Sequence, residues 1–136
     1  MSYDAARPRY SLELAGKNYE LLGTFELIEA CEHALGEGII RIAKRVMDMG
    51  VTDTAKLLAA MLTSSGHKAT VKDMGDAILG LGIDSEEHGM LKIHLFAFLR
   101  ILLSPPKDRE GVAEAMGKLT GKLETASPGE TTSDSA

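Results

Sequence analysis

Apolar and polar residues alternate at the start of the chain, over residues 10–22. Leu12 and Leu14 lie before a short polar segment and Tyr19 and Leu21 lie after it, and Ala15–Asn18 contains the glycine and asparagine that tight turns require. A period of two places the apolar side chains on one face of a strand, so this pattern predicts a β-hairpin. Because an isolated hairpin is only marginally stable, we expect it to lie on helices or to pair with another chain.

After Thr24 the apolar residues recur every three or four positions, which predicts helices. Glycines and prolines separate these segments, and Thr24, Thr70 and the sequence Asp84–Glu87 supply the capping side chains typical of helix starts. In the second helix we expect Met47 to face inward. The predicted helices cover residues 25–35, 38–49, 52–64, 70–80 or 70–82, and 84–104, with a sixth after the diproline at 105–106.

The fifth predicted helix is apolar on two sides. Its main face carries Leu91, Leu95, Phe98 and Leu102, and a second set lies roughly opposite. Such a helix is either central in its own domain or covered by a partner, whose helix would bind with apolar anchors at a spacing of three to four residues. The candidate partner-binding residues on this second side are Ile93, Phe96 and Leu103.

The sixth predicted helix has a narrow apolar stripe at spacing i, i+4, i+7 and i+11. Gly117 and Gly121 lie inside it, and interior glycines each cost about 1 kcal/mol relative to alanine, so this helix needs a docking surface to persist. Internal packing and binding to a partner remain equal alternatives, since the diproline forms a hinge. The candidate partner-binding residues here are Val112, Met116, Leu119 and Leu123.

These patterns predict a mainly α fold with an N-terminal β-hairpin (α+β) and about six helices in a small bundle. The domain organisation that we expect is a flexible N-terminus at 1–9, a core domain of hairpin and five helices at 10–104, a hinged amphipathic helix at 105–124 and a disordered tail at 125–136.

Composition narrows the function. The chain of 136 residues has a formal charge of −5, and its scattered bases argue against nucleic-acid binding through phosphate contacts. A single cysteine fits a reducing compartment, and neither a leader nor an apolar run long enough to span a membrane is present in this sequence. We therefore expect a cytoplasmic protein.

Candidate chemistry is sparse. The four histidines and Cys31 lack metal-ligand spacing, and we expect the histidines to be surface or half-buried residues. Glu29 and His33, four positions apart, are typical of a surface pair, and no nucleophile elbow or phosphate loop is present. The sequence predicts a protein that is not an enzyme and that uses no cofactor or metal.

The opening nevertheless resembles a known family. A hairpin with a glycine in its turn is followed by Tyr-x-Leu and then by Thr-Phe leading into an acidic helix that ends in Ala-Leu-Gly. The matching residues are Ser11–Leu21, Thr24, Phe25, Leu27 and Glu32–Gly36. This order is similar to that of the gene transfer agent group of phage tail proteins, which have been described both as tail-assembly chaperones and as tail tube proteins. A looser likeness continues through a Gly66–His67 loop to the apolar helix at Met90–Leu103, and the residues after Pro106 depart from it.

The resemblance implies a tail-assembly chaperone in the bacterial host cell. Such a protein binds the tape-measure protein, or another tail protein, and keeps its long apolar helical segments soluble until the tube assembles around them. The family has no catalytic residues to carry over. A structural role in the tail tube or tail tip is the alternative, and a DNA-binding regulator is a third, disfavoured because its recognition helix would carry Asp73 and Asp76. The hairpin edge and the last helix also permit homo-oligomers.

Overall fold

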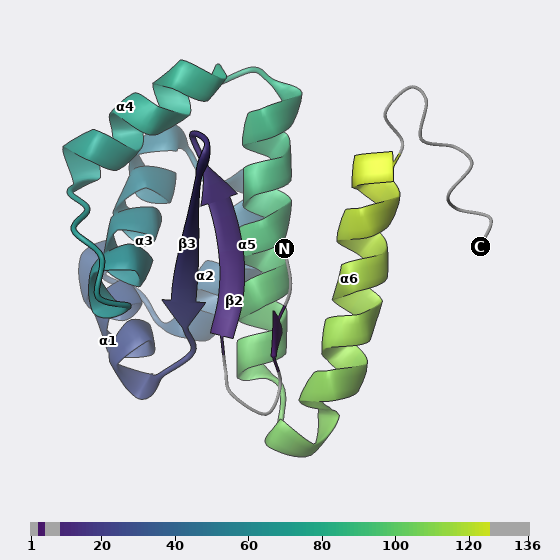
Figure 1. The fold of residues 1–136 in the computed structure, drawn as a ribbon. Helices are drawn as coiled ribbons and strands as arrows, with labels where there is room; N and C mark the ends of the chain where they lie inside the picture. Colours follow the sequence, from purple (N-terminus) through teal and green to yellow (C-terminus); the bar gives the residue numbers. More distant parts are fainter. Residues whose placement is uncertain (1–2, 5–8, 126–136) are drawn as a thin grey trace.

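The fold is mainly α with an N-terminal β-hairpin, as the sequence predicts (Figure 1). The computed structural model describes residues 3–4 and 9–125, with side chains described for 9–120. The hairpin consists of β2 (Arg9–Leu14) and β3 (Lys17–Leu22), which pair antiparallel with Leu12 opposite Tyr19. A two-residue strand, β1 (Tyr3–Asp4), which the alternation does not predict, pairs with the outer edge of β2. The other predicted flexible and disordered residues, 1–2, 5–8 and 126–136, lie outside the described ones.

Helices cover one face of this sheet, and their limits agree closely with the periodicity. The last helix lies beside α5, on its outer side in Figure 1. Within the described part of the chain the helices are α1 (Phe25–Leu35), α2 (Ile39–Arg45), α3 (Val51–Ser64), α4 (Val71–Leu81), α5 (Glu86–Leu103) and α6 (Arg109–Thr125), with short 3-10 turns at Val46–Asp48 and Pro106–Asp108.

Local capping chemistry explains why these helices begin where they do. The Thr24 hydroxyl accepts a hydrogen bond from the backbone N–H of Leu27 (3.2 Å), and the Thr70 hydroxyl accepts one from Asp73 (3.0 Å). Each bond satisfies one of the N–H groups that the first turn of a helix leaves without an intrahelical partner. The predicted caps at both threonines are therefore confirmed.

The predicted cap of α5 is displaced by one residue. Asp84 is exposed, and Ser85 takes the cap position instead. The Ser85 hydroxyl accepts from the N–H of His88 (3.1 Å) and donates to the carbonyl of Gly82 (2.6 Å). A hydroxyl can make both bonds at once, whereas a carboxylate only accepts, which favours serine at this position.

The second predicted helix is also shorter than expected. It leaves α-helical geometry after Arg45 and continues as a 3-10 turn, in which side chains advance by three residues per turn. The prediction that Met47 faces inward is wrong, since Met47 is 41% exposed. Met49 is buried in its place.

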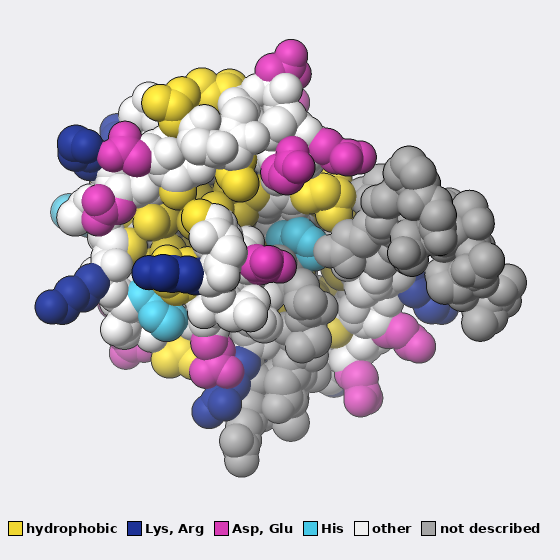
Figure 2. All heavy atoms as spheres, turned by 45° about the horizontal axis from the view of Figure 1, so that its top comes forward, with side chains coloured by type: hydrophobic (Ala, Val, Ile, Leu, Met, Phe, Trp, Pro, Cys, Tyr) yellow, Lys and Arg dark blue, Asp and Glu magenta, His cyan; other side chains and the backbone are white. Residues whose placement is uncertain are grey.

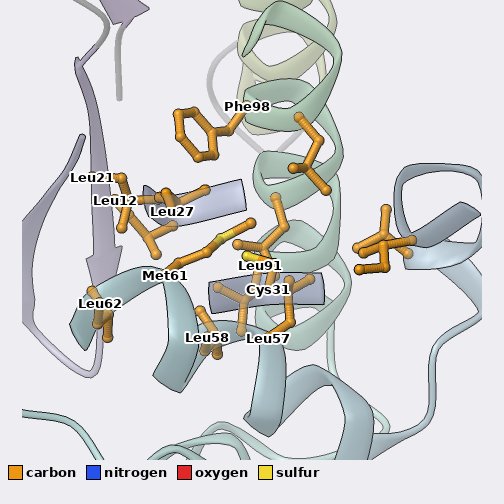
Figure 3. Close-up of a cluster of buried hydrophobic side chains, with 14 of the residues drawn as sticks. Leu12, Leu21, Leu27, Cys31, Leu57, Leu58, Met61, Leu62, Leu91 and Phe98 are labelled. Carbon is orange, nitrogen blue, oxygen red and sulfur yellow. The ribbon is translucent and has the colours of Figure 1, made fainter. Parts of the chain in front are cut away.

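The core lies between the hairpin and helices α1, α3 and α5 (Figure 3). The apolar face predicted for the hairpin is confirmed, because Leu12 and Leu21 are fully buried and meet the helices. Tyr10 fastens β2 to α5, since its ring centroid lies 5.4 Å from that of Phe98 and its hydroxyl is 3.1 Å from Nδ1 of His94.

The loop between α3 and α4 lies against the outer edge of β3. The N–H of Leu22 donates to the Ser65 hydroxyl (2.9 Å), and Nε2 of His67 donates to the carbonyl of Glu20 (3.0 Å). The ring of His67 also meets Tyr19 edge to face, with centroids 5.2 Å apart. This loop thus satisfies backbone groups that an edge strand would otherwise present to solvent.

Candidate functional site

The residues predicted to bind a partner are divided between α5 and α6. Phe96 and Leu103 of α5 and Val112 and Met116 of α6 are half-buried and pack against the hydrophobic core. Helices α5 and α6 pack side by side (Figure 1), and we call the contact of Val112 and Met116 with α5 the α5–α6 seam. Phe96 and Leu103 lie on the side of α5 that carries Lys92, whose Nζ donates to the carbonyl of Met49 (2.7 Å), so this side faces the 3-10 turn at Val46–Asp48.

The remaining predicted residues differ in their exposure. Ile93 is half-buried, and Leu119 is 38% exposed. Leu123 lies among the residues whose side chains are not described. Thr120, which the predicted stripe omits, is buried, and its hydroxyl donates to the carbonyl of Gly117 (3.2 Å).

Arg109 fixes the connection between α5 and α6. Its Nε donates to the carbonyl of Ser104 and its Nη2 to the carbonyl of Leu102, each at 3.2 Å. The last carbonyls of a helix lack intrahelical partners and carry the negative end of the helix dipole, so a guanidinium stabilises this end. Sequence reasoning singled out the neighbouring prolines as a hinge and missed this residue, although a cation just after a helix is a recognisable signal.

A cleft of about 520 Å³ opens between the hairpin and the first half of α5. We call it the hairpin–α5 cleft. Its apolar walls come from the hairpin, the end of α4 and α5, and the lysine, arginine and carboxylate positions among its described lining residues are all glutamates. The lining residues are Ser11, Glu13, Leu14, Ala15, Gly16, Asn18, Leu81, Glu86, Glu87, Met90, Leu91 and His94. On the face that Figure 2 turns toward the reader, acidic side chains lie close to apolar ones and to a histidine.

Both sides of the cleft carry negative charge. Glu13 lies on β2, and Glu86 and Glu87 occupy the first turn of α5; all three are exposed. Leu14 and Leu91, which also line the cleft, are buried. His94 is also buried, and its Nδ1 lies 3.1 Å from the Tyr10 hydroxyl. The cleft therefore combines a buried, hydrogen-bonded histidine with exposed carboxylates at its sides. The sequence pattern did not reveal this arrangement, because its parts come from three separate elements.

Two histidines are more buried than expected. His88 and His94 are each only 5% exposed, which corrects the prediction of surface or half-buried histidines. Nδ1 of His88 donates to the carbonyl of Ile83 (2.8 Å), and His94 is bound to Tyr10. These bonds offset part of the cost of burying a polar ring, although Nε2 of His88 is buried without a hydrogen-bond partner among the described residues. His33 is exposed and His67 is half-buried.

Cys31 is placed in the core, as its position in the middle of the apolar stripe predicts. Burial and, to a smaller extent, the negative charge of Glu32 together raise the pKa of its thiol from 9.0 to about 12. Since the thiolate is the reactive form, this cysteine is a packing residue and a poor nucleophile in the folded protein.

The glutamates of α1 have two different roles. Glu26 and Glu29 are exposed. Glu32 instead accepts a hydrogen bond from the N–H of Ile39 (2.8 Å) and thereby caps α2.

Searches for other chemistry give a negative result within the described part of the chain. No group of three histidine, cysteine or carboxylate side chains among the described residues is arranged to hold a metal ion. None of the described helices combines the length and the apolar character needed to cross a membrane. Comparison with protein families, with curated proteins and with solved structures finds no significant match.

Proposed function

We propose that this protein is a tail-assembly chaperone that binds helical segments of a tape-measure protein during the assembly of a phage or gene transfer agent tail. The proposal rests on the resemblance of residues 11–36 to that family and on the helical fold. One structural observation carries it further, namely the unequal burial of the apolar residues of α6.

The apolar stripe of α6 is only partly used inside the molecule. Val112 and Met116 are half-buried in the seam, and Leu119, one turn further, remains 38% exposed. A partner helix that adds to this side would bury the remaining apolar surface through anchors at helical spacing. The client that we propose is an apolar helix of the tape-measure protein, held between α6 and the neighbouring surface of α5.

The alternative, a structural subunit of the tail tube or tip, is less well supported by this fold. Tubes are generally lined by sheet-rich barrels, whereas the described residues contain two six-residue strands and one of two residues. We therefore favour the assembly role over the structural one.

The test is co-expression with the tape-measure protein of the same tail gene cluster. We expect the soluble fraction of the tape-measure protein to increase several-fold, and the two proteins to co-purify. Leu119→Asp should remove most of this effect, because it places a charge in the proposed contact. Ile40→Asp is the matched control, since Ile40 is a 56% exposed apolar residue on α2, outside the seam.

An unchanged soluble fraction with the wild-type chain would contradict the chaperone role. Equal losses with Leu119→Asp and Ile40→Asp would show that α6 is not the contact surface. A circular dichroism comparison of both variants with the wild type distinguishes such results from a loss of folding.

A further inference from the structure

We propose that the hairpin–α5 cleft is a second docking site, which takes a lysine- or arginine-bearing apolar helix of a partner protein. The proposal does not depend on the role in tail assembly, since it rests on the shape and charge of the cleft alone. The described residues that line it come from the hairpin, α4 and the first half of α5, and none belongs to α6.

The cleft matches the chemistry of a long cationic side chain. Lysine and arginine carry an apolar stem of several methylene groups and a charged end, and they bury the stem while keeping the charge at a polar rim. Leu14, Leu81 and Met90 provide apolar contacts for the stem. Glu13 and Glu87 provide carboxylates at the sides, and a volume of about 520 Å³ is ample for more than one such side chain.

The charge of the cleft has one sign. Among the described residues that line it, three are glutamates and none is lysine or arginine. Glu86 and Glu87 also stabilise the N-terminus of α5, where negative charge is favourable. That role does not account for Glu13, which lies on a strand and faces the same cleft from the opposite wall. Attraction of a cationic partner accounts for the carboxylates on both walls.

The walls are held in place before any partner arrives. The Tyr10 hydroxyl and Nδ1 of His94 join β2 to α5, and the Tyr10 and Phe98 rings pack together across the same two elements. The hairpin turn is fixed by Ala15 and Gly16, whose φ values of 54° and 80° are typical of a tight two-residue turn. A site that is already ordered loses little conformational entropy on binding, so a short helix is sufficient as a ligand.

The experiment measures fluorescence anisotropy of a labelled helical peptide that carries leucine and lysine at helical spacing. We expect it to bind the full chain more weakly as salt is raised, because salt screens exposed charges. Glu13→Gln with Glu87→Gln should weaken binding about tenfold, since each exposed ion pair contributes up to about 1 kcal/mol. Met90→Gln should weaken it as well, by removing an apolar contact.

The matched control is Glu26→Gln with Glu29→Gln. This pair changes the net charge by the same amount on exposed residues, and Glu26, like Glu87, is the second residue of its helix. We expect the control pair to bind the peptide as the wild type does. Thermal unfolding of both double variants checks that any difference arises from the cleft.

Four results would overturn the proposal. The first is the absence of binding to the wild type, and the second is an equal loss in both double variants, which would show attraction by net charge alone. The third is displacement of the peptide by spermine at concentrations similar to that of the peptide, which would show that the cleft binds small cations rather than a helix. A dimer in light scattering that dissociates in Glu13→Gln with Glu87→Gln would assign the cleft to a second copy of this chain.

Discussion

The core and α6 both carry apolar side chains at regular spacing, yet the fold buries them to very different extents. In the core, Leu12, Leu58 and Phe98 are completely removed from solvent. In α6, the corresponding positions are half-buried or exposed, although the helix is seventeen residues long. Periodicity therefore indicates which side of an element is apolar. The number of elements packed around that side decides how much its burial contributes to stability.

The difference follows from geometry. Helix α5 packs against β2, α2, α4 and the 3-10 turn at Val46–Asp48, whereas α6 packs chiefly on α5. Gly111 and Gly117 lower the helical stability of α6 still further. Local stability in a protein ranges from that of fraying segments to that of the whole fold, and we expect α6 and the core to lie far apart on this scale.

Truncation in the two regions should give the largest contrast. Phe98→Ala should lower the free energy of unfolding by about 3–5 kcal/mol, because it leaves a cavity at a fully buried site. Met116→Ala should lower it by about 1 kcal/mol, since the side chain is only half-buried. Urea unfolding followed by circular dichroism measures both. Comparable losses at the two sites would show that α6 is part of the core.

Thiol labelling measures how fast the core and α6 each open, because a buried cysteine reacts only when its region opens. Since the pKa of Cys31 is raised to about 12, its thiol stays protonated in the folded state between pH 9 and 12, where an unfolded thiol ionises. Ionisation thus favours unfolding as the pH rises through this window. Near neutral pH, Cys31 should react with iodoacetamide only on global unfolding.

The reference for that measurement is Met116→Cys in the same chain. We expect the introduced cysteine to react at least about tenfold faster than Cys31, because local opening of α6 requires less free energy. Mass spectrometry of the two labelled peptides gives both rates in one sample. Equal rates would mean that α6 and the core open together.

The smallest predicted effect concerns the helix backbone. Gly117→Ala should stabilise α6 by about 1 kcal/mol and slow its amide exchange about fivefold, because the added methyl group meets open space. Gly36→Ala is the control of opposite sign, since Gly36 has φ of 68° and ends α1 in the left-handed region. Hydrogen exchange followed by mass spectrometry measures the effect of both substitutions. An unchanged exchange rate of α6 in Gly117→Ala would contradict the marginal stability of this helix.

Much of the fold is predictable from the sequence because its signals are local. Thr24 and Thr70 cap helices through bonds to residues three positions away, so the chain itself contains the whole interaction. The cap of α5 depends on a local bond of the same kind, but Asp84 and Ser85 are both capping residues, and the prediction chose the wrong one of the two.

The remaining features depend on contacts between distant residues. The burial of His94 requires Tyr10, which lies 84 positions away, and no periodicity within α5 indicates that pairing. The hairpin–α5 cleft likewise combines β2, the end of α4 and α5. For α6, the pattern left internal packing and partner binding equally open, and its half-buried position on α5 explains why the sequence alone did not separate them.

The loop that covers β3 limits how this protein can associate with copies of itself. A continuous wall of strands running from subunit to subunit needs two open edges in every sheet, one to receive a neighbour and one to offer the next place. Ser65 and His67 already occupy backbone groups of Leu22 and Glu20 on one edge. The sheet therefore terminates on that side, and a ring or filament built from this chain would have to be joined through its helices.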